Sequence, residues 1–269
     1  MRWDVDEDSR PGRSKSEGGV RRGEHERGAV AEMLRSDRRS RTARFSSSLA
    51  DWLRSIAIAF LLFLLVRTSV VEAFKIPTSS MEGTLLVGDF LLVNKAVYGA
   101  HIPGLDLSLP ALAEPERGDV IVFHPPHEPE KNYVKRVVGV AADTLEMRDK
   151  RLYLNGAPVY EPYAQHLDGR GDAVHPDMGW QSHHLIASPL PAYQPTRDNW
   201  GPIVVPDGRF FVLGDNRDNS EDSRYWGFVS RDEVRGRPWL VYYSHQVVAE
   251  DPLASLSQVR WSRLGTVIR

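Results

Sequence analysis

The stretch "PTSSMEGT", residues 77–84, places two adjacent hydroxyl groups, Ser79 and Ser80, where either could act as a nucleophile. A serine hydroxyl is a weak nucleophile until a base removes its proton. The stretch contains no histidine, which is the usual base. The chain contains no cysteine, which excludes a thiol nucleophile and a thiolate metal site. A catalytic serine here would therefore need a base from elsewhere in the chain.

A lysine can serve as that base, because burial disfavours its charged form and lowers its pKa toward neutrality. Lys135 lies in the middle of the apolar, strand-like run "NYVKRVVGV". At a period of two it shares a face with Tyr133 and Val137, while Arg136 points to the opposite face. An alternative is an edge strand whose lysine guards against aggregation. Both interpretations fit this run.

A third polar cluster, "LGDNRDNSEDSRYWGF" at residues 213–228, follows the strand-like "RFFV". A solvated surface loop would explain its charge density. The apolar residues on both sides favour instead a loop that is held between two strands. Such a loop can orient its side chains. Asp222 and Arg224 could pair with each other, and Ser220 could hold a lysine ammonium in position.

The elements that would position these residues are mostly short β-type runs, which begin after residue 85 and are bounded by Gly, Pro, Asn and Asp. "RDKRLYLNGAPV" is typical of a hairpin with polar turns at both ends. The pattern predicts a mainly β protein with an antiparallel catalytic sheet, formed by residues 75–159 and 207–248. Residues 160–206 are expected to form an insertion or second lobe, and residues 249–269 a C-terminal segment.

Four histidines of residues 160–206 raise the possibility of a metal site. Their spacing fits neither a helical pair nor a zinc finger, and scattered loop histidines are usually solvated. We therefore expect no metal and no cofactor. The histidines are His166, His175, His183 and His184.

The longest apolar run, residues 51–74, is expected to be a transmembrane helix that spans roughly 34 Å. Residues 1–50 are rich in Arg, Gly, Ser and acidic residues, and we expect them to be a disordered tail. The basic cluster between Arg35 and Arg44 places this tail in the cytoplasm and the catalytic domain on the other side of the inner (plasma) membrane. A buried core helix and a cleaved signal peptide are the alternatives.

Four stretches in order behind this run resemble the successive sequence boxes of type I signal peptidases, the bacterial leader peptidases of serine protease family S26. They are "IPTSSMEGTLLVGD", "RGDVIVF", "YVKRVVGVAADTLEM" and "GDNRDNSEDSRYWGFV". The resemblance extends to about residue 245 and omits the tail and residues 160–206. It implies a membrane-anchored serine endopeptidase that removes signal peptides through an acyl-enzyme.

The resemblance also implies roles for individual residues. The nucleophile, which precedes a methionine, falls on Ser80, and the general base falls on Lys135. Thr78 corresponds to the hydroxyl that helps the amide of Ser80 to bind the oxyanion. The supporting positions fall on Ser220, Asp222, Arg224, Gly214 and Asp215. Two positions depart from the family pattern, since Ser79 replaces a usual glycine and Gly83 a usual proline.

The expected partners are preproteins with signal peptides, the lipid bilayer and, by proximity, the secretion machinery. The formal net charge of −2 gives no general attraction to nucleic acid, and we expect none to bind. One alternative is a processing protease dedicated to a single exported protein. Another is a non-catalytic, membrane-anchored envelope module. A relative of the self-cleaving repressors would need a DNA-binding head, which the pattern does not offer.

Overall fold

The computed structural model describes residues 51–64, 70–99, 101–102, 107–108, 110–169, 172–186, 193–246 and 258–269. The tail predicted over residues 1–50 lies outside these residues. The chain divides into two units, residues 1–62 and residues 63–269. The second unit contains all the strands that the structure describes.

Residues 51–64 are helical, and their large apolar side chains are exposed, with Trp52 at 61% and Leu61 at 65%. Within the described ranges, no helix is both long and apolar enough to cross a membrane. The helix predicted over residues 51–74 is wrong at its C-terminal end, because Val71–Lys75 forms strand β1. The apolar pattern there serves a sheet, since β1 pairs along its whole length with β2 (Asp89–Asn94).

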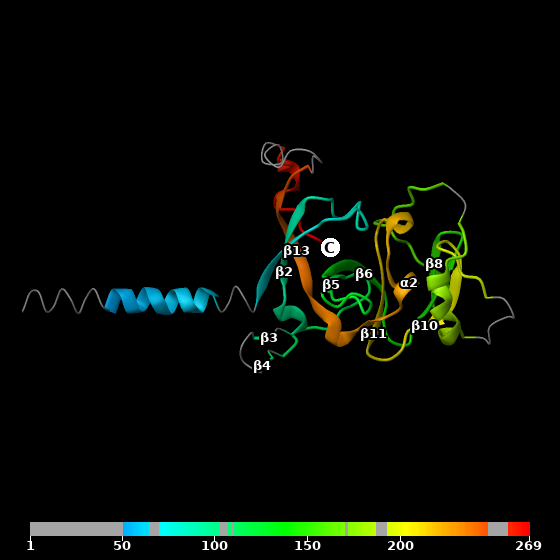
Figure 1. Ribbon diagram of the computed structural model, residues 1–269, viewed down its shortest axis with the longest axis horizontal. Coiled ribbons are helices and arrows are strands. Elements are labelled where there is room, and N and C mark those ends of the chain that lie inside the picture. The colour runs from blue at the N-terminus through cyan, green and yellow to red at the C-terminus, as the bar shows by residue number, and fades with distance from the viewer. Residues whose placement is uncertain are drawn as a thin grey trace, which may run out of the picture. The chain divides into compact units, whose positions relative to one another are not determined.

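Seven strands form the main sheet, and every pair of neighbours is antiparallel (Figure 1). Their order is β1, β2, β13 (Val234–Ser244), β5 (Val120–Phe123), β6 (Tyr133–Gly139), β11 (Arg209–Leu213) and β12 (Val229–Ser230). Strand β6, which carries Lys135, lies between β5 and β11. The alternative that Lys135 guards an edge strand is therefore wrong.

A smaller antiparallel sheet has the order β10 (Trp200–Val204), β7 (Thr144–Arg148), β8 (Arg151–Leu154) and β9 (Ala157–Pro158). The turn residues Asp149-Lys150 and Asn155-Gly156 all have positive φ, as two-residue hairpin turns of type I′ require. The predicted hairpin is confirmed. Strand β10 comes from residues 160–206, so this segment completes the sheet.

The remaining elements are short. Strands β3 (His101–Ile102) and β4 (Leu107–Ser108) pair with each other, and α2 spans Ser223–Trp226. The 3-10 helices are η1 (Ala96–Tyr98), η2 (Pro176–His184), η3 (Arg217–Asn219), η4 (Arg231–Glu233) and η5 (Trp261–Arg263). The mainly β, antiparallel architecture predicted from the sequence is confirmed for the described residues.

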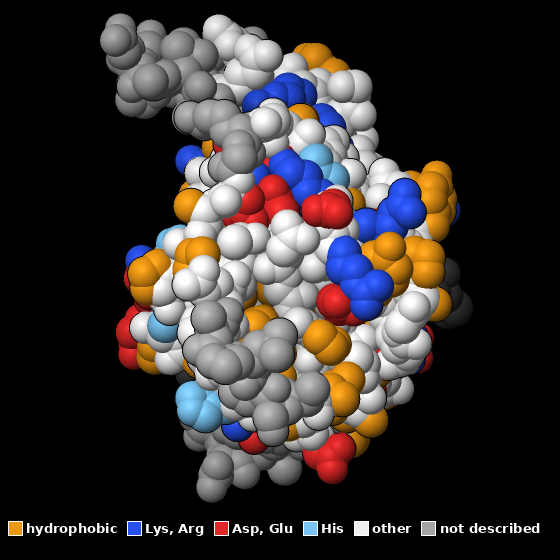
Figure 2. All heavy atoms as spheres, turned by 90° about the vertical axis from the view of Figure 1, so that its right-hand side faces the viewer, with side chains coloured by type: hydrophobic (Ala, Val, Ile, Leu, Met, Phe, Trp, Pro, Cys, Tyr) orange, Lys and Arg blue, Asp and Glu red, His pale blue; other side chains and the backbone are white. Residues whose placement is uncertain are grey.

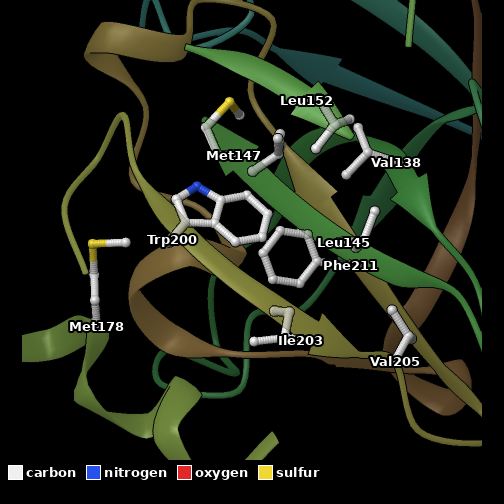
Figure 3. Close-up of a cluster of buried hydrophobic side chains, with 10 residues drawn as sticks. Val138, Leu145, Met147, Leu152, Met178, Trp200, Ile203, Val205 and Phe211 are labelled. Carbon is white, nitrogen blue, oxygen red and sulfur yellow. The ribbon is translucent and has the colours of Figure 1, made fainter. Parts of the chain in front are cut away.

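One apolar core joins the two sheets. Phe211 of β11 lies against Trp200 of β10, with ring centroids 5.2 Å apart, and Val138 of β6 and Leu145 of β7 belong to the same cluster (Figure 3). Burial of such side chains is the main stabilising term in folding. The shared core fixes β6 and β11, the two strands that lead to the polar site, with respect to the small sheet.

Charged side chains gather in a few clusters on the face near the small sheet (Figure 2). Figure 2 shows acidic and basic groups next to one another there, with apolar groups scattered between them. The described side chains on this face form no extended patch of one sign. This mixture agrees with the nearly neutral formal charge of −2.

Candidate active site

The structure brings Ser80 and Lys135 together. Lys135 Nζ donates a hydrogen bond to Ser80 Oγ at 2.6 Å, although the residues are 55 positions apart. Ser80 lies in the turn-rich segment between β1 and β2, whereas Lys135 is in the middle of β6, where it pairs with Ile121 of β5. A central strand held by ladders on both sides gives the lysine a fixed backbone position.

Lys135 is only 4% exposed. Burial lowers its pKa to about 8, although the nearby Asp222 carboxylate raises it and the Arg224 guanidinium lowers it further. In the described part of the chain, no carboxylate forms an ion pair with Lys135. A pKa of about 8 leaves a fraction of the amine neutral near physiological pH, and the neutral form is the one that a general base requires.

The predicted ion pair between Asp222 and Arg224 is confirmed. Arg224 donates through Nε to Oδ1 and through Nη2 to Oδ2, both at 2.8 Å, and both side chains are buried. Burial by itself raises the pKa of Asp222, but the Arg224 guanidinium outweighs it and holds that pKa below its usual value. Asp222 Oδ2 also accepts from the amide of Gly214 at 3.0 Å. The pair thereby fixes the chain where it leaves β11.

Gly214 lies where this chain passes the backbone of Ser80. An added Cβ would lie 2.4 Å from the carbonyl oxygen of Ser80 and 2.2 Å from Ser220 Oγ. Real Cβ atoms essentially never approach so closely, and the first of these atoms belongs to the backbone. Only glycine permits this contact between the segment that follows β11 and the backbone of Ser80.

Asn216 and Asn219 also hold the nucleophile segment, and the sequence interpretation did not select them. The amide of Asn216 donates to the carbonyl oxygen of Ser80 at 3.1 Å, and its Nδ2 donates to that of Ser79 at 3.2 Å. Asn219 Nδ2 donates to Ser79 Oγ at 2.8 Å. Both asparagines lie in the polar cluster at residues 213–228, and this position is the sequence feature that could have identified them.

Arg136 points away from Lys135, as the strand alternation predicted. It donates through Nε and Nη2 to the two carboxylate oxygens of Asp215, at 2.8 and 2.7 Å. Both side chains are buried, and Thr84 Oγ1 donates to Asp215 Oδ2 at 2.5 Å. Asp215 therefore ties β6 to the segment of the nucleophile from the face opposite Lys135.

Thr78 and Ser220 lie near the pair but contribute differently. Thr78 Oγ1 is 3.5 Å from Ser80 Oγ, so a hydroxyl is available beside the nucleophile. The Ser220 hydroxyl is buried and makes no hydrogen bond within the described residues, which includes none to Lys135. Its expected role in orienting the lysine stays a prediction.

The two departures from the family pattern have local explanations. The hydroxyl of Ser79 is used in the bond from Asn219, and φ at Ser79 is not positive. Gly83 has φ of +102°, a conformation that side chains rarely adopt, and a Cβ there would lie 2.5 Å from Gln165 Nε2. Proline, with φ near −65°, could not take this conformation.

The pair opens into a cleft with a volume of about 600 Å³. It is lined by residues 74–81, by residues 131–135, and by Asn219 and Glu221. Apolar side chains such as Phe74, Ile76 and Met81 line it together with the polar pair. A cleft of this kind can hold a short extended peptide over Ser80.

Of the four histidines considered as metal ligands, His183 and His184 are neighbours in η2, and the others have different partners. His166 Nδ1 is 3.5 Å from Asp218, His175 contacts the ring of Tyr225, and His184 contacts that of Trp180. The described residues contain no group of three or more side chains suited to hold a metal ion.

Comparison with known proteins agrees with this site. The family described as "Signal peptidase, peptidase S26" matches residues 49–243. The chain is 38% identical over 233 residues to a protein named signal peptidase I from Pseudomonas aeruginosa, and the match covers 81% of this chain and 79% of the relative. It is 31% identical over 246 residues to signal peptidase I from Aquifex aeolicus, with 77% and 91% covered. The chain belongs to the S26 family of signal peptidases.

Proposed function

We propose that the protein is a membrane-anchored serine endopeptidase that removes N-terminal signal peptides from exported preproteins, with Ser80 as nucleophile and Lys135 as general base. The observation that carries this proposal is the 2.6 Å contact between Lys135 Nζ and Ser80 Oγ in the cleft. The relatives named signal peptidase I support the substrate class.

The reaction is hydrolysis through an acyl-enzyme. Neutral Lys135 Nζ takes the hydroxyl proton as Ser80 Oγ bonds to the scissile carbonyl carbon, and the carbonyl electron pair moves to its oxygen. Thr78 Oγ1 and the amide of Ser80 stabilise that oxyanion. When the intermediate collapses, the C–N bond breaks and the lysine ammonium gives its proton to the leaving amine. Water then attacks the ester with the same base, and Ser80 recovers its proton.

Membrane attachment is the second part of the proposal. Residues 51–64 form a helix with exposed apolar side chains, among them Phe60 at 59% and Leu62 at 59% exposure. Burial of such a surface in a bilayer is favourable. The N-terminal side would be cytoplasmic by the distribution of arginines, and the catalytic domain extracytoplasmic. A signal peptide has its cleavage site just outside the same bilayer, which brings it to the enzyme.

The test is cleavage of a preprotein with small residues at −1 and −3 by the purified full chain, with the product identified by mass. Ser80→Ala and Lys135→Ala should each lower the rate by roughly 10³-fold or more. Lys135→Arg should be equally inactive, because arginine stays protonated. Retention of the wild-type circular dichroism spectrum would show that these variants are folded.

The outcomes separate the alternatives. A non-catalytic envelope module predicts no cleavage by the wild type and no effect of Ser80→Ala on its role in the cell. A dedicated processing protease predicts that one preprotein is cleaved and that others with equivalent sites are not. Cleavage that persists in Lys135→Ala would contradict lysine as the base.

A further inference from the structure

Glu221 lines the same cleft as the pair of Ser80 and Lys135, and the mechanism gives it no task. It lies between Ser220 and Asp222, and its side chain is exposed, in contrast to both neighbours. Although burial has the largest effect on the pKa of Lys135 and of Tyr133, the Glu221 carboxylate raises both. The charge of Glu221 therefore acts on Lys135 and on Tyr133, which both line the cleft.

The other acidic groups around the pair are occupied by fixed partners. Asp222 is paired with Arg224, and Asp215 with Arg136. Glu221 forms no hydrogen bond or ion pair with any residue that the structure describes. Its carboxylate is thus a negative charge in the lining of the cleft that no neighbouring cation holds in place.

The cations that line the cleft do not cancel this charge. Lys131 Nζ is paired with Glu128 at 2.8 Å, and Lys135 is neutral when it acts as a base. Lys75 lies over the ring of Phe90, on the wall that β1 contributes. Glu221 and Lys75 thus bring opposite charges to the lining of the cleft.

We infer that Glu221 is a specificity-determining residue, which favours substrates with a basic side chain, and disfavours those with an acidic one, at the position that faces it beside the scissile bond. This inference rests on the proposed function. Such selection does not need a buried ion pair, because a substrate side chain with the same charge as Glu221 is repelled and binds more weakly.

The experiment uses peptides with alanine at −1 and −3, in which one flanking position at a time carries Lys, Gln or Glu. We measure the ratio of kcat/KM for the Lys peptide to that for the Gln peptide. An effect of Glu221 on the basicity of Lys135 cancels in this ratio, because the same enzyme cleaves both peptides. At one or more positions the wild-type ratio should be roughly two to five, as expected for an exposed charge pair.

Glu221→Gln should bring this ratio to about one, and Glu221→Lys should invert it. Glu116→Gln is the matched control, because Glu116 is equally exposed but lines a different hollow of the molecule. It should leave the ratio unchanged. The wild-type preference should also fall as salt is raised, because exposed charges are screened.

Equal ratios for the wild type and Glu221→Gln at every position would overturn the inference while leaving the proposed function intact. Failure of the wild type to cleave any peptide would contradict the proposed function. In that case, binding of the same peptides to Ser80→Ala and to Ser80→Ala with Glu221→Gln decides the matter. Equal affinities of both chains for the Lys and Glu peptides would then overturn the charge preference.

Discussion

Lys135 and Arg136 are adjacent cations that β6 directs into two different buried surroundings. Arg136 meets the carboxylate of Asp215 in a two-bond geometry. Lys135 meets the hydroxyl of Ser80 instead, and burial moves its pKa to about 8. Both side chains are nearly inaccessible, but of the two residue types only a lysine can become a neutral base when it is buried, because an arginine guanidinium stays protonated in proteins.

The lowered pKa of Lys135 sets the direction of the pH dependence. Below a pH of about 8 the amine is mostly protonated and cannot accept the proton of Ser80, so kcat/KM should rise about tenfold per pH unit and level off above that value. Rates of peptide cleavage measured between roughly pH 6 and pH 10 test this. A flat profile would contradict a lysine base. Circular dichroism over the same range controls for unfolding.

At the residue scale, the resemblance to the signal peptidase family selected Ser80, Lys135 and the pair of Asp222 and Arg224. The residues alone left Ser79 and Ser80 equivalent and left Lys135 open between a base and a guard of an edge strand, whereas the short spacing between Asp222 and Arg224 did indicate a pair. The contacts of Asn216 and Asn219 with the nucleophile segment could not be predicted. Those of Asn216 depend on main-chain carbonyls and that of Asn219 on the Ser79 hydroxyl, and the sequence contains no sign of where these groups will point.

Two non-repetitive segments form the site at the scale of elements. Residues 77–84 precede β2, residues 214–220 follow β11, and the amide of Asn216 bonds to Ser80 across them.

The β runs and the tight hairpin were predictable, because alternation and Asn-Gly turns are local signals. The placement of β13 between β2 and β5 was not, since it pairs residues far apart in sequence. The strand at Val71–Lys75 was missed because an apolar run suits either structure.

The contact of Gly214 with the backbone of Ser80 can be tested by one methyl group. Gly214→Ala should push the two segments apart and lower kcat/KM by roughly 100-fold, because a shift of about 1 Å at a reacting group has this effect. Gly169→Ala is the matched control, since its added Cβ meets nothing within 4 Å. Peptide cleavage and thermal unfolding are measured for both. Wild-type activity in Gly214→Ala would show that the contact does not position Ser80.

At the scale of the whole molecule, the helix at residues 51–64 stands out because its large apolar side chains are exposed. Ile58, Leu61 and Leu62 are between 49% and 65% exposed. Replacing all three by Gln should weaken association with lipid vesicles by roughly 1.5–3 kcal/mol per side chain, while cleavage of soluble peptides continues. Co-flotation with vesicles measures the association. Leu112→Gln, at a body residue that is 79% exposed, is the control. Unchanged flotation of the triple variant would contradict attachment through this helix.

The hydrogen bond from the Asn216 amide to the Ser80 carbonyl determines when the site can form during folding. Ser80 precedes β5 and β6 in the sequence, whereas Asn216 follows both strands. The bond can therefore form only when β11, which leads to Asn216, has paired with β6. Pairings of such long range form slowly, because the loop between them must close first. Before that, and whenever the sheet opens, Ser80 and Lys135 are two residues 55 positions apart in a chain that does not hold them together. A copy of the chain that has not finished folding therefore lacks the assembled pair of Ser80 and Lys135 on which the proposed activity depends.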